Sequence, residues 1–354
     1  MFKKIYKIGK LTKFFRGHYY IYPKILRIVI RKRLGWRYPA IVDIAVTSDC
    51  NYKCKHCYAS EFQNLDTKQS LSFEEIKQII DDACSLGVIM ITLTGGESLL
   101  RKDIFDIIDY IKREKKMLVQ LTSNGYFLNS EIIRKLKLSG LFNLNVSING
   151  IGISHDEFCG MPGAYERAIA AIKMSLEEGL FTKFQLVARK ESIRSGEFQA
   201  IIDIVNKCKA SSKINFPMLS RRYSDPETVL LAKQEREYIR DLAKKDNVIL
   251  DTANSMRSEY CPMVDSSIFI APNGEVFPCA FIQIAFGNIK KEALRDVLKK
   301  MQGSVFFKNP YKCCPAGESM NFIKKYILPC LEHNKGVIYY KSHPLFSEEK
   351  QNII

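Results

Sequence analysis

Cys50, Cys54 and Cys57 stand within eight positions of the chain, in the segment VTSDCNYKCKHC that covers residues 46–57. Three thiolates do not complete the four-coordinate site that zinc prefers, so either a distant residue supplies the fourth ligand or one position stays open. In a cubane iron–sulfur cluster each cysteine binds a different iron, and three cysteines leave one iron open for a small chelating ligand. The spacing therefore favours an iron–sulfur cluster over a zinc ribbon, whose ligands come as paired C-x2-C knuckles.

The chain around these cysteines alternates between strand-like and helix-like segments up to about residue 245. The pattern predicts strands at 41–48, 88–96, 117–125, 142–150, 182–190 and 213–219, and helices at 72–87, 103–116, 130–140, 165–179 and 197–208. Because neighbouring parallel strands need a crossover connection, these repeats predict a parallel sheet with helices outside. Their number favours an α/β fold with a partial (β/α)6 TIM-like barrel over 41–250. The cysteine loop then lies at the carboxyl ends of the strands, where such folds place function.

The pattern changes after about residue 250. The segment 269–281 predicts a hairpin that turns at Asn273 and Gly274, and 289–301 predicts a helix. Four of the eleven cysteines lie from Cys279 onward in otherwise irregular sequence. A short irregular segment with so many cysteines usually needs a metal to hold it together. We expect a small cysteine-rich α+β domain over 251–354.

The first forty residues form a basic arm. Residues 1–42 hold twelve Lys or Arg and no Asp or Glu, so most of the net charge of +16 lies there, mixed with Ile, Leu, Phe and Tyr. Such an arm suits contact with an anionic membrane. A nucleic acid is one alternative, and a helix on the outside of the barrel with its lysines in water is another. No secretory signal or apolar run of about 20 residues is present, so we expect a cytoplasmic protein, either free or peripheral to a membrane.

The cysteine loop, Cys50-x3-Cys54-x-His56-Cys57, resembles the signature loop of the radical S-adenosylmethionine (radical SAM) superfamily. TGGES at 94–98 resembles the GGE motif of that family, and the resemblance covers about residues 41–220. It implies that Gly95, Gly96 and Glu97 hold the amino group of the methionine moiety. TSNG at 122–125 and SING at 147–150 end the third and fourth predicted strands. By similarity, they supply candidates for ribose or carboxylate contacts: Ser123, Asn124, Ser147 and Asn149.

The resemblance implies a [4Fe-4S] cluster, S-adenosylmethionine, and an electron donor such as ferredoxin or flavodoxin. Reductive cleavage of S-adenosylmethionine would give a 5′-deoxyadenosyl radical that takes a hydrogen atom from an unidentified substrate. The segment 155–172 also resembles the family, but Cys159 stands where arginine is common. That residue is either a small buried side chain or a reactive thiol near the site.

The C-terminal cysteines resemble the auxiliary-cluster module called SPASM, or its shortened twitch form. Cys261, followed by Gly274 and by Cys279 five residues later, reproduces the opening of the module. The later cysteine array is incomplete, since only Cys313, Cys314 and Cys330 remain. One auxiliary [4Fe-4S] cluster is therefore expected, held by Cys261, Cys279, Cys330 and one of the adjacent pair, for which we favour Cys314. A zinc-stabilised tail is the alternative.

The substrate stays open at this point between a lipid-linked or membrane-proximal small molecule and a peptide. A rival of another class is a non-catalytic zinc or iron–sulfur protein that binds RNA through its basic arm. TGGES would then have no role, and the aromatic residues of the arm form no evident stacking platform. We therefore do not expect nucleic acid as a partner.

Overall fold

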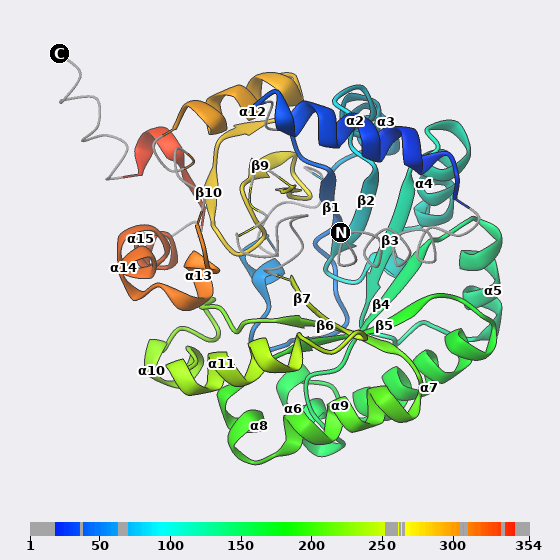
Figure 1. Ribbon diagram of the computed structural model, residues 1–354, viewed down its shortest axis with the longest axis vertical. Helices are drawn as coiled ribbons and strands as arrows, with labels where there is room; N and C mark the ends of the chain where they lie inside the picture. Colours follow the sequence, from blue (N-terminus) through cyan, green and yellow to red (C-terminus); the bar gives the residue numbers. More distant parts are fainter. Residues whose placement is uncertain are drawn as a thin grey trace, which may run out of the picture.

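The computed structural model describes residues 18–35, 38–62, 70–251, 261, 263, 266–304, 307, 311–333 and 337–343, so the arm over 1–17 lies outside the described residues. Within this part of the chain, ten strands form one sheet in the order β11-β9-β8-β1-β2-β3-β4-β5-β6-β7 (Figure 1). The strands from β1 to β7 follow one another in chain order and pair in parallel. This sheet ends at β7 and β11 without closing, and the predicted partial barrel is confirmed.

The parallel strands are short, and their bounds lie within one to four residues of most predicted ones. They are β1 (Ile41–Thr47), β2 (Met90–Gly95), β3 (Leu118–Ser123), β4 (Asn143–Ser147), β5 (Thr182–Val187), β6 (Ser211–Asn215) and β7 (Val248–Leu250). The sequence analysis missed β7, because three residues are too few to show a periodicity.

The crossover helices lie on the outer side of the sheet (Figure 1). Their bounds are α3 (Phe73–Ser85), α4 (Ile104–Asp109), α5 (Ser130–Leu138), α6 (Ile153–Cys159), α7 (Ala164–Glu177), α8 (Lys190–Arg194), α9 (Glu197–Lys207), α10 (Pro226–Val229) and α11 (Lys233–Leu242). The predicted capping box of α3 is present, since the Ser72 hydroxyl accepts from the Glu75 amide and the Glu75 carboxylate accepts from the Ser72 amide. The predicted helix at 103–116 ends in a π-helical turn over Tyr110–Glu114.

The C-terminal part of the chain continues the barrel sheet. Strand β8 (Ser267–Ile270) pairs in parallel with β1 on the side away from β2. The predicted hairpin joins it to β9 (Glu275–Phe277), and Gly274 supplies the positive φ of +87° at the turn. The remaining elements are β10 (Ile284–Ala285), β11 (Gly287–Asn288), α12 (Leu294–Gly303), α13 (Pro315–Glu318), α14 (Met320–Phe322), α15 (Leu328–Glu332) and β12 (Ile338–Tyr339). The cysteine-rich segment is thus attached to the barrel through β8.

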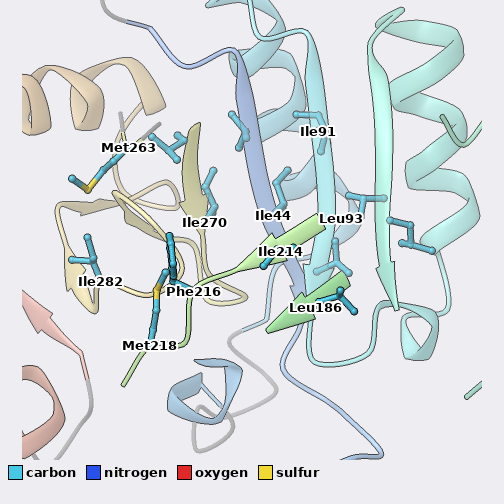
Figure 2. Packing of buried hydrophobic residues seen from close by; sticks show 14 of the residues in the cluster. Ile44, Ile91, Leu93, Leu186, Ile214, Phe216, Met218, Met263, Ile270 and Ile282 are labelled. Carbon is cyan, nitrogen blue, oxygen red and sulfur yellow. The ribbon is translucent and has the colours of Figure 1, made fainter. Parts of the chain in front are cut away.

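The two faces of the barrel strands differ in character. Side chains such as Ile44, Ile91, Leu93, Leu186 and Ile214 are buried in the main apolar core (Figure 2). The alternating positions face the inside of the barrel and are largely polar, as shown by the residues that line an internal cavity. No helix among the described residues has the length and apolar character to cross a bilayer.

Helix α2 (Ile21–Arg33) covers the amino-terminal ends of the strands. Ile21 is fully buried against Leu118 and Phe142, which lie at the starts of β3 and β4. The Lys24 ammonium donates to the carbonyls of Lys115 and Lys116 at 3.0 and 2.7 Å. The described part of the basic arm is therefore a helix packed on the outside of the barrel, as one of the alternatives predicted, although Lys24 binds the barrel instead of lying in water.

Candidate active site

The cysteine loop leaves β1 at its carboxyl end. Cys50, Cys54 and Cys57 are partly exposed, and the loop is held down by the amides of Lys53 and Lys55, which donate to the carbonyls of Cys159 and Phe158 at 3.1 and 3.0 Å. The carboxyl end of α6, the helix after β4, thus holds the cysteine loop in place. Figure 1 shows this loop beside the mouth of the barrel, between β1 and the C-terminal segments.

Gly95 and Gly96 let the end of β2 pack directly against the cysteine loop. The Gly96 amide donates to the Thr47 carbonyl at 2.9 Å, and the Glu97 amide donates to the Asp49 carbonyl at 2.7 Å. A Cβ at Gly96 would overlap the Asp49 carbonyl, and one at Gly95 would overlap the Thr47 carbonyl. Glycine is required at both positions for this close approach of two backbones.

Glu97 is completely buried, and its carboxylate accepts three hydrogen bonds. The donors are the Ser123 hydroxyl at 2.9 Å, the Asn124 amide at 2.7 Å and the Leu99 amide at 3.1 Å. Burial raises the pKa of Glu97, and the three hydrogen bonds act in the opposite direction. Its two oxygens already bind the chain itself, so this carboxylate joins the end of β2 to the end of β3.

Asn124 connects that network to the cysteine loop. Its Nδ2 donates to Asn51 Oδ1 at 2.9 Å and lies 4.0 Å from Cys50 Sγ. Asn51 and Tyr52, next to Cys50, each keep a buried polar atom without a hydrogen-bond partner, Nδ2 and the hydroxyl respectively. Such atoms are costly to bury unpaired, and they mark a place where a polar ligand would fit.

The last two predicted contacts lie at the end of β4. Ser147 is partly exposed, whereas Asn149 is buried. Asn149 Oδ1 accepts from the Val187 backbone amide at 3.1 Å, and the backbone amide of Asn149 donates to His155 Nδ1 at 2.9 Å. In this structure Asn149 joins β4 to β5, and Ser147 is the more accessible of the two.

Cys159 lies directly beside the cysteine loop and is buried. Its thiol forms a hydrogen bond with that of Cys54, and its Sγ lies 3.6 Å from His155 Nε2. His56 stacks on Phe158 with ring centroids 4.8 Å apart. Burial lowers the pKa of both histidines to about 4, so they are neutral at neutral pH. Cys159 is therefore a small side chain packed at the base of the loop.

The cysteine loop has the donor set of an iron–sulfur cluster. Burial, together with a thiolate at Cys54, raises the pKa of Cys50 to about 12 and that of Cys57 to about 11, so the three thiols share one environment. Among the described residues, no three His, Cys, Asp or Glu side chains converge on a point that would hold a single metal ion. A cubane cluster does not need such convergence, because each cysteine binds a different iron.

A second group of cysteines lies between the barrel and the C-terminal helices. Burial raises the pKa of Cys261 to about 12 and also raises those of Cys279 and Cys314. A thiolate at Cys261 further raises the pKa of the other two, which shows that the three thiols are neighbours. Cys313 acts electrostatically on Cys261 alone, and Cys330 is buried on α15, where its thiol donates to the Tyr326 carbonyl at 3.3 Å.

A cavity of about 320 Å³ runs through the inside of the barrel. At the amino-terminal ends of the strands its wall is apolar and consists of Ile28, Ile41, Met90, Leu118 and Phe142. Further along the strands the wall is polar and includes Asp43, Thr92, Gln120, Lys183, Gln185, Lys213, Asn215 and Asp251. Cys279 also lines the cavity, so one wall belongs to the C-terminal cysteine group.

The polar wall is a hydrogen-bonded network with open positions. Asp251 accepts from Lys213 at 2.9 Å and from Asn215 at 2.7 Å. Asn215 Oδ1 and Gln185 Oε1 are buried in the cavity wall without partners. Sequence analysis missed these residues. The signal was the alternation of polar with apolar residues in strands that should be buried on both faces, as in TKFQLV and SSKIN.

The sequence comparisons agree with these two cysteine groups. The radical SAM superfamily model matches residues 44–193, and the model of the SPASM iron–sulfur cluster-binding domain matches residues 261–316. An AdoMet-dependent heme synthase of Methanosarcina barkeri is 26% identical over 289 residues, which cover 73% of this chain and 82% of that protein. A GTP 3′,8-cyclase of Campylobacter fetus is 28% identical over 246 residues, which cover 68% of this chain and 72% of that protein.

Solved structures share the fold at lower identity. Streptococcus suis SuiB bound to the precursor peptide SuiA matches with a TM-score of 0.61 at 17% identity, over 88% of this chain and 77% of SuiB. Native anSMEcpe with bound AdoMet matches with a TM-score of 0.58 at 14% identity, over 83% of this chain and 98% of that one. The two family models, the cysteine loop with its GGE neighbour and the partial barrel agree on one assignment: the chain carries a radical SAM domain over 44–193 and a SPASM domain over 261–316, with the [4Fe-4S] and S-adenosylmethionine cofactors that these imply.

Proposed function

We propose that this chain reductively cleaves S-adenosylmethionine and abstracts a hydrogen atom from a substrate inside the barrel. The observation that carries the proposal is the position of Asn124, which contacts both the cysteine loop and Glu97. The cluster motif and the GGE motif are thereby parts of one site. When bound, the cluster and S-adenosylmethionine together supply a 5′-deoxyadenosyl radical that can remove hydrogen from an unactivated carbon.

The chain's own residues would bind and orient the cofactors. Cys50, Cys54 and Cys57 would hold the cluster through their thiolates. Gly95 and Gly96, which pack the end of β2 against the cysteine loop, would offer backbone groups to the amino group of the methionine moiety, as the family resemblance implies. Glu97 would fix Ser123 and Asn124 rather than contact the ligand, since its oxygens are already engaged. Ser147, as a more accessible hydroxyl, would contact the ribose or carboxylate, and Asn149 would keep the ends of β4 and β5 in place.

The C-terminal cysteines would hold one auxiliary cluster. The proposed ligands are Cys261, Cys279, Cys314 and Cys330, with Cys314 preferred over Cys313 because Cys314 is the buried one and faces two other cysteines. Cys279 lines the cavity, so this cluster would form part of the substrate chamber and could exchange electrons with its contents.

The substrate would occupy the barrel cavity between the two cysteine groups. The volume of the cavity is near the lower end of the range for small-molecule sites, which suits a small molecule or one side chain of a peptide. Gln185 Oε1 and Asn215 Oδ1 would accept hydrogen bonds from a hydroxyl or amide of that substrate. A lipid-linked or membrane-proximal small molecule and a peptide both fit this volume and these hydrogen-bond acceptors. A ferredoxin or flavodoxin would supply the electron that cleaves S-adenosylmethionine.

The test is anaerobic reconstitution of the full chain with iron and sulfide, beside a Cys50/Cys54/Cys57→Ala variant. Iron and sulfide are counted, and 5′-deoxyadenosine is assayed after addition of S-adenosylmethionine and a strong reductant. We expect about eight irons in the natural chain and about four in the variant, because each cubane holds four. Only the natural chain should form the nucleoside.

The other outcomes are decisive as well. About four irons that fall to none in the variant, with nucleoside formed, would keep the enzyme and make the C-terminal cysteines a zinc or structural site. Zinc in place of iron, without nucleoside, would contradict the radical reaction and favour a binding protein.

A further inference from the structure

The outer face of α2 carries a stripe of large apolar side chains. Leu26, Ile30 and Leu34 are 60%, 48% and 66% exposed, and their spacing of four residues places them in one row. Of the ten large hydrophobic side chains that are exposed among the described residues, four lie between Tyr19 and Leu34, and the other six are scattered along the chain. Single exposed apolar residues need no explanation, but a row of three marks an interaction surface.

The opposite face of α2 packs against the barrel. Ile21 and Ile28 are buried against the barrel, and Arg31 donates to the Leu86 carbonyl at 2.6 Å. Together with the bonds from Lys24 to the loop before β3, these contacts fix which side of α2 faces away from the barrel. The apolar side chains of this side therefore face away from the barrel, where a partner could contact them.

The charge around the stripe selects the partner. Arg27 and Arg33 are exposed on the same face as Leu26 and Ile30, and no acidic residue occurs before Asp43. A second copy of the chain would set these arginines against one another, and like charges repel. Apolar side chains flanked by arginines match the two layers of an anionic membrane, with lipid phosphates above and acyl chains beneath.

The position of α2 relative to the cavity gives this surface a role. Ile28, on the inner face of α2, lines the apolar end of the cavity, whereas the cysteine loop lies at the opposite ends of the strands. Figure 1 shows α2 along the upper edge of the molecule, above β1 and β2. We infer that the outer face of α2 docks on an anionic lipid bilayer and sets the apolar end of the cavity against the lipid.

Vesicle flotation of the full chain tests this inference without any turnover. The natural chain, a Leu26→Ser/Ile30→Ser variant and a Leu138→Ser control are mixed with phosphatidylcholine vesicles that contain or lack phosphatidylglycerol. Leu138 is a matched control because it is 78% exposed on α5, away from α2. We expect the natural chain to bind only vesicles that contain phosphatidylglycerol. The double variant should bind them at least about tenfold more weakly, and the Leu138→Ser control should bind them as the natural chain does.

Thermal unfolding followed by circular dichroism checks that the variants stay folded, which substitutions at exposed positions should allow. Equal vesicle binding by the natural chain and the Leu26→Ser/Ile30→Ser variant would overturn the inference. So would binding by neither, or a concentration-dependent dimer that this variant abolishes, since the face would then be an interface between two copies. Each of these results would leave the proposed reaction unaffected.

Discussion

The Ser123 hydroxyl donates to the Glu97 carboxylate across 2.9 Å, and this bond ties the end of β3 to the end of β2. The same carboxylate accepts from the amides of Asn124 and Leu99, and Asn124 reaches from there to the cysteine loop. A buried carboxylate with three donors positions its neighbours, because it has little capacity left for a ligand. In the GGE motif the glutamate therefore positions the ends of β2 and β3, and the glycines pack the end of β2 against the cysteine loop.

Replacement of Glu97 by alanine should destabilise the fold and abolish binding of S-adenosylmethionine together. The buried Ser123 hydroxyl and the partly buried amides of Asn124 and Leu99 would lose their acceptor, and the loss of a buried partner costs about 1–3 kcal/mol. We expect a fall of about 3 kcal/mol or more in the free energy of unfolding, measured by urea denaturation. The Glu97→Gln variant keeps one side-chain oxygen, so its free energy of unfolding should lie between those of the natural chain and the alanine variant. An alanine variant as stable as the natural chain, but unable to bind, would show that Glu97 contacts the ligand directly.

Gly96→Ala should displace the cysteine loop. The added methyl group would overlap the Asp49 carbonyl, which belongs to the backbone and cannot rotate away. We expect the reconstituted variant to lose the iron of one cluster, about four atoms per chain, and to lose S-adenosylmethionine binding. Gly303→Ala is the control, because nothing lies within 4 Å of the methyl group there. Full iron content in the Gly96 variant would mean that the loop and β2 can separate without harm.

Most of the framework was predictable from the sequence, and the reasons are local. Apolar runs, three of which end in glycine, predicted the barrel strands, and Ser72 with Glu75 predicted the start of α3. The role of Glu97 was not predictable, because its partners Ser123 and Asn124 come from the next strand. The pairing of β8 with β1 was also missed, since a sequence pattern does not say which edge a strand joins.

The polar interior of the barrel was missed for a different reason. Asp43, Thr92 and Gln120 each stand singly among apolar neighbours, and only the parallel register places them side by side. Once there, the Gln120 amide donates to the Thr92 hydroxyl at 3.4 Å, and Thr92 in turn bonds to Asp43. A chamber of this kind is a property of the sheet, not of any one strand.

Asp43 should make the stability of the protein depend on pH. Burial raises its pKa to about 6, with Lys213 acting in the opposite direction. Between pH about 4 and about 6 the folded state holds a proton that the unfolded state has released, so the free energy of unfolding falls as pH rises through this window. Asp43→Asn should remove a fall of about 2–3 kcal/mol, measured by urea denaturation at several pH values. Asp106→Asn, an exposed aspartate on α4, is the control and should leave the slope unchanged.

Cys313 and Cys314 offer a test of the auxiliary site at single-residue resolution. Cys314 is 5% exposed and neighbours both Cys261 and Cys279, whereas Cys313 is only partly buried and interacts with Cys261, with Glu318 and with two arginines. The test uses the Cys50/Cys54/Cys57→Ala background, in which only the auxiliary cluster can form. We expect about four irons per chain to remain after Cys313→Ala and almost none after Cys314→Ala. The adjacent positions make each variant the control of the other.

The reverse result would transfer the ligand role to Cys313. Iron retained in both variants would mean that the cluster needs neither thiol, and Cys261, Cys279 and Cys330 would then hold it alone.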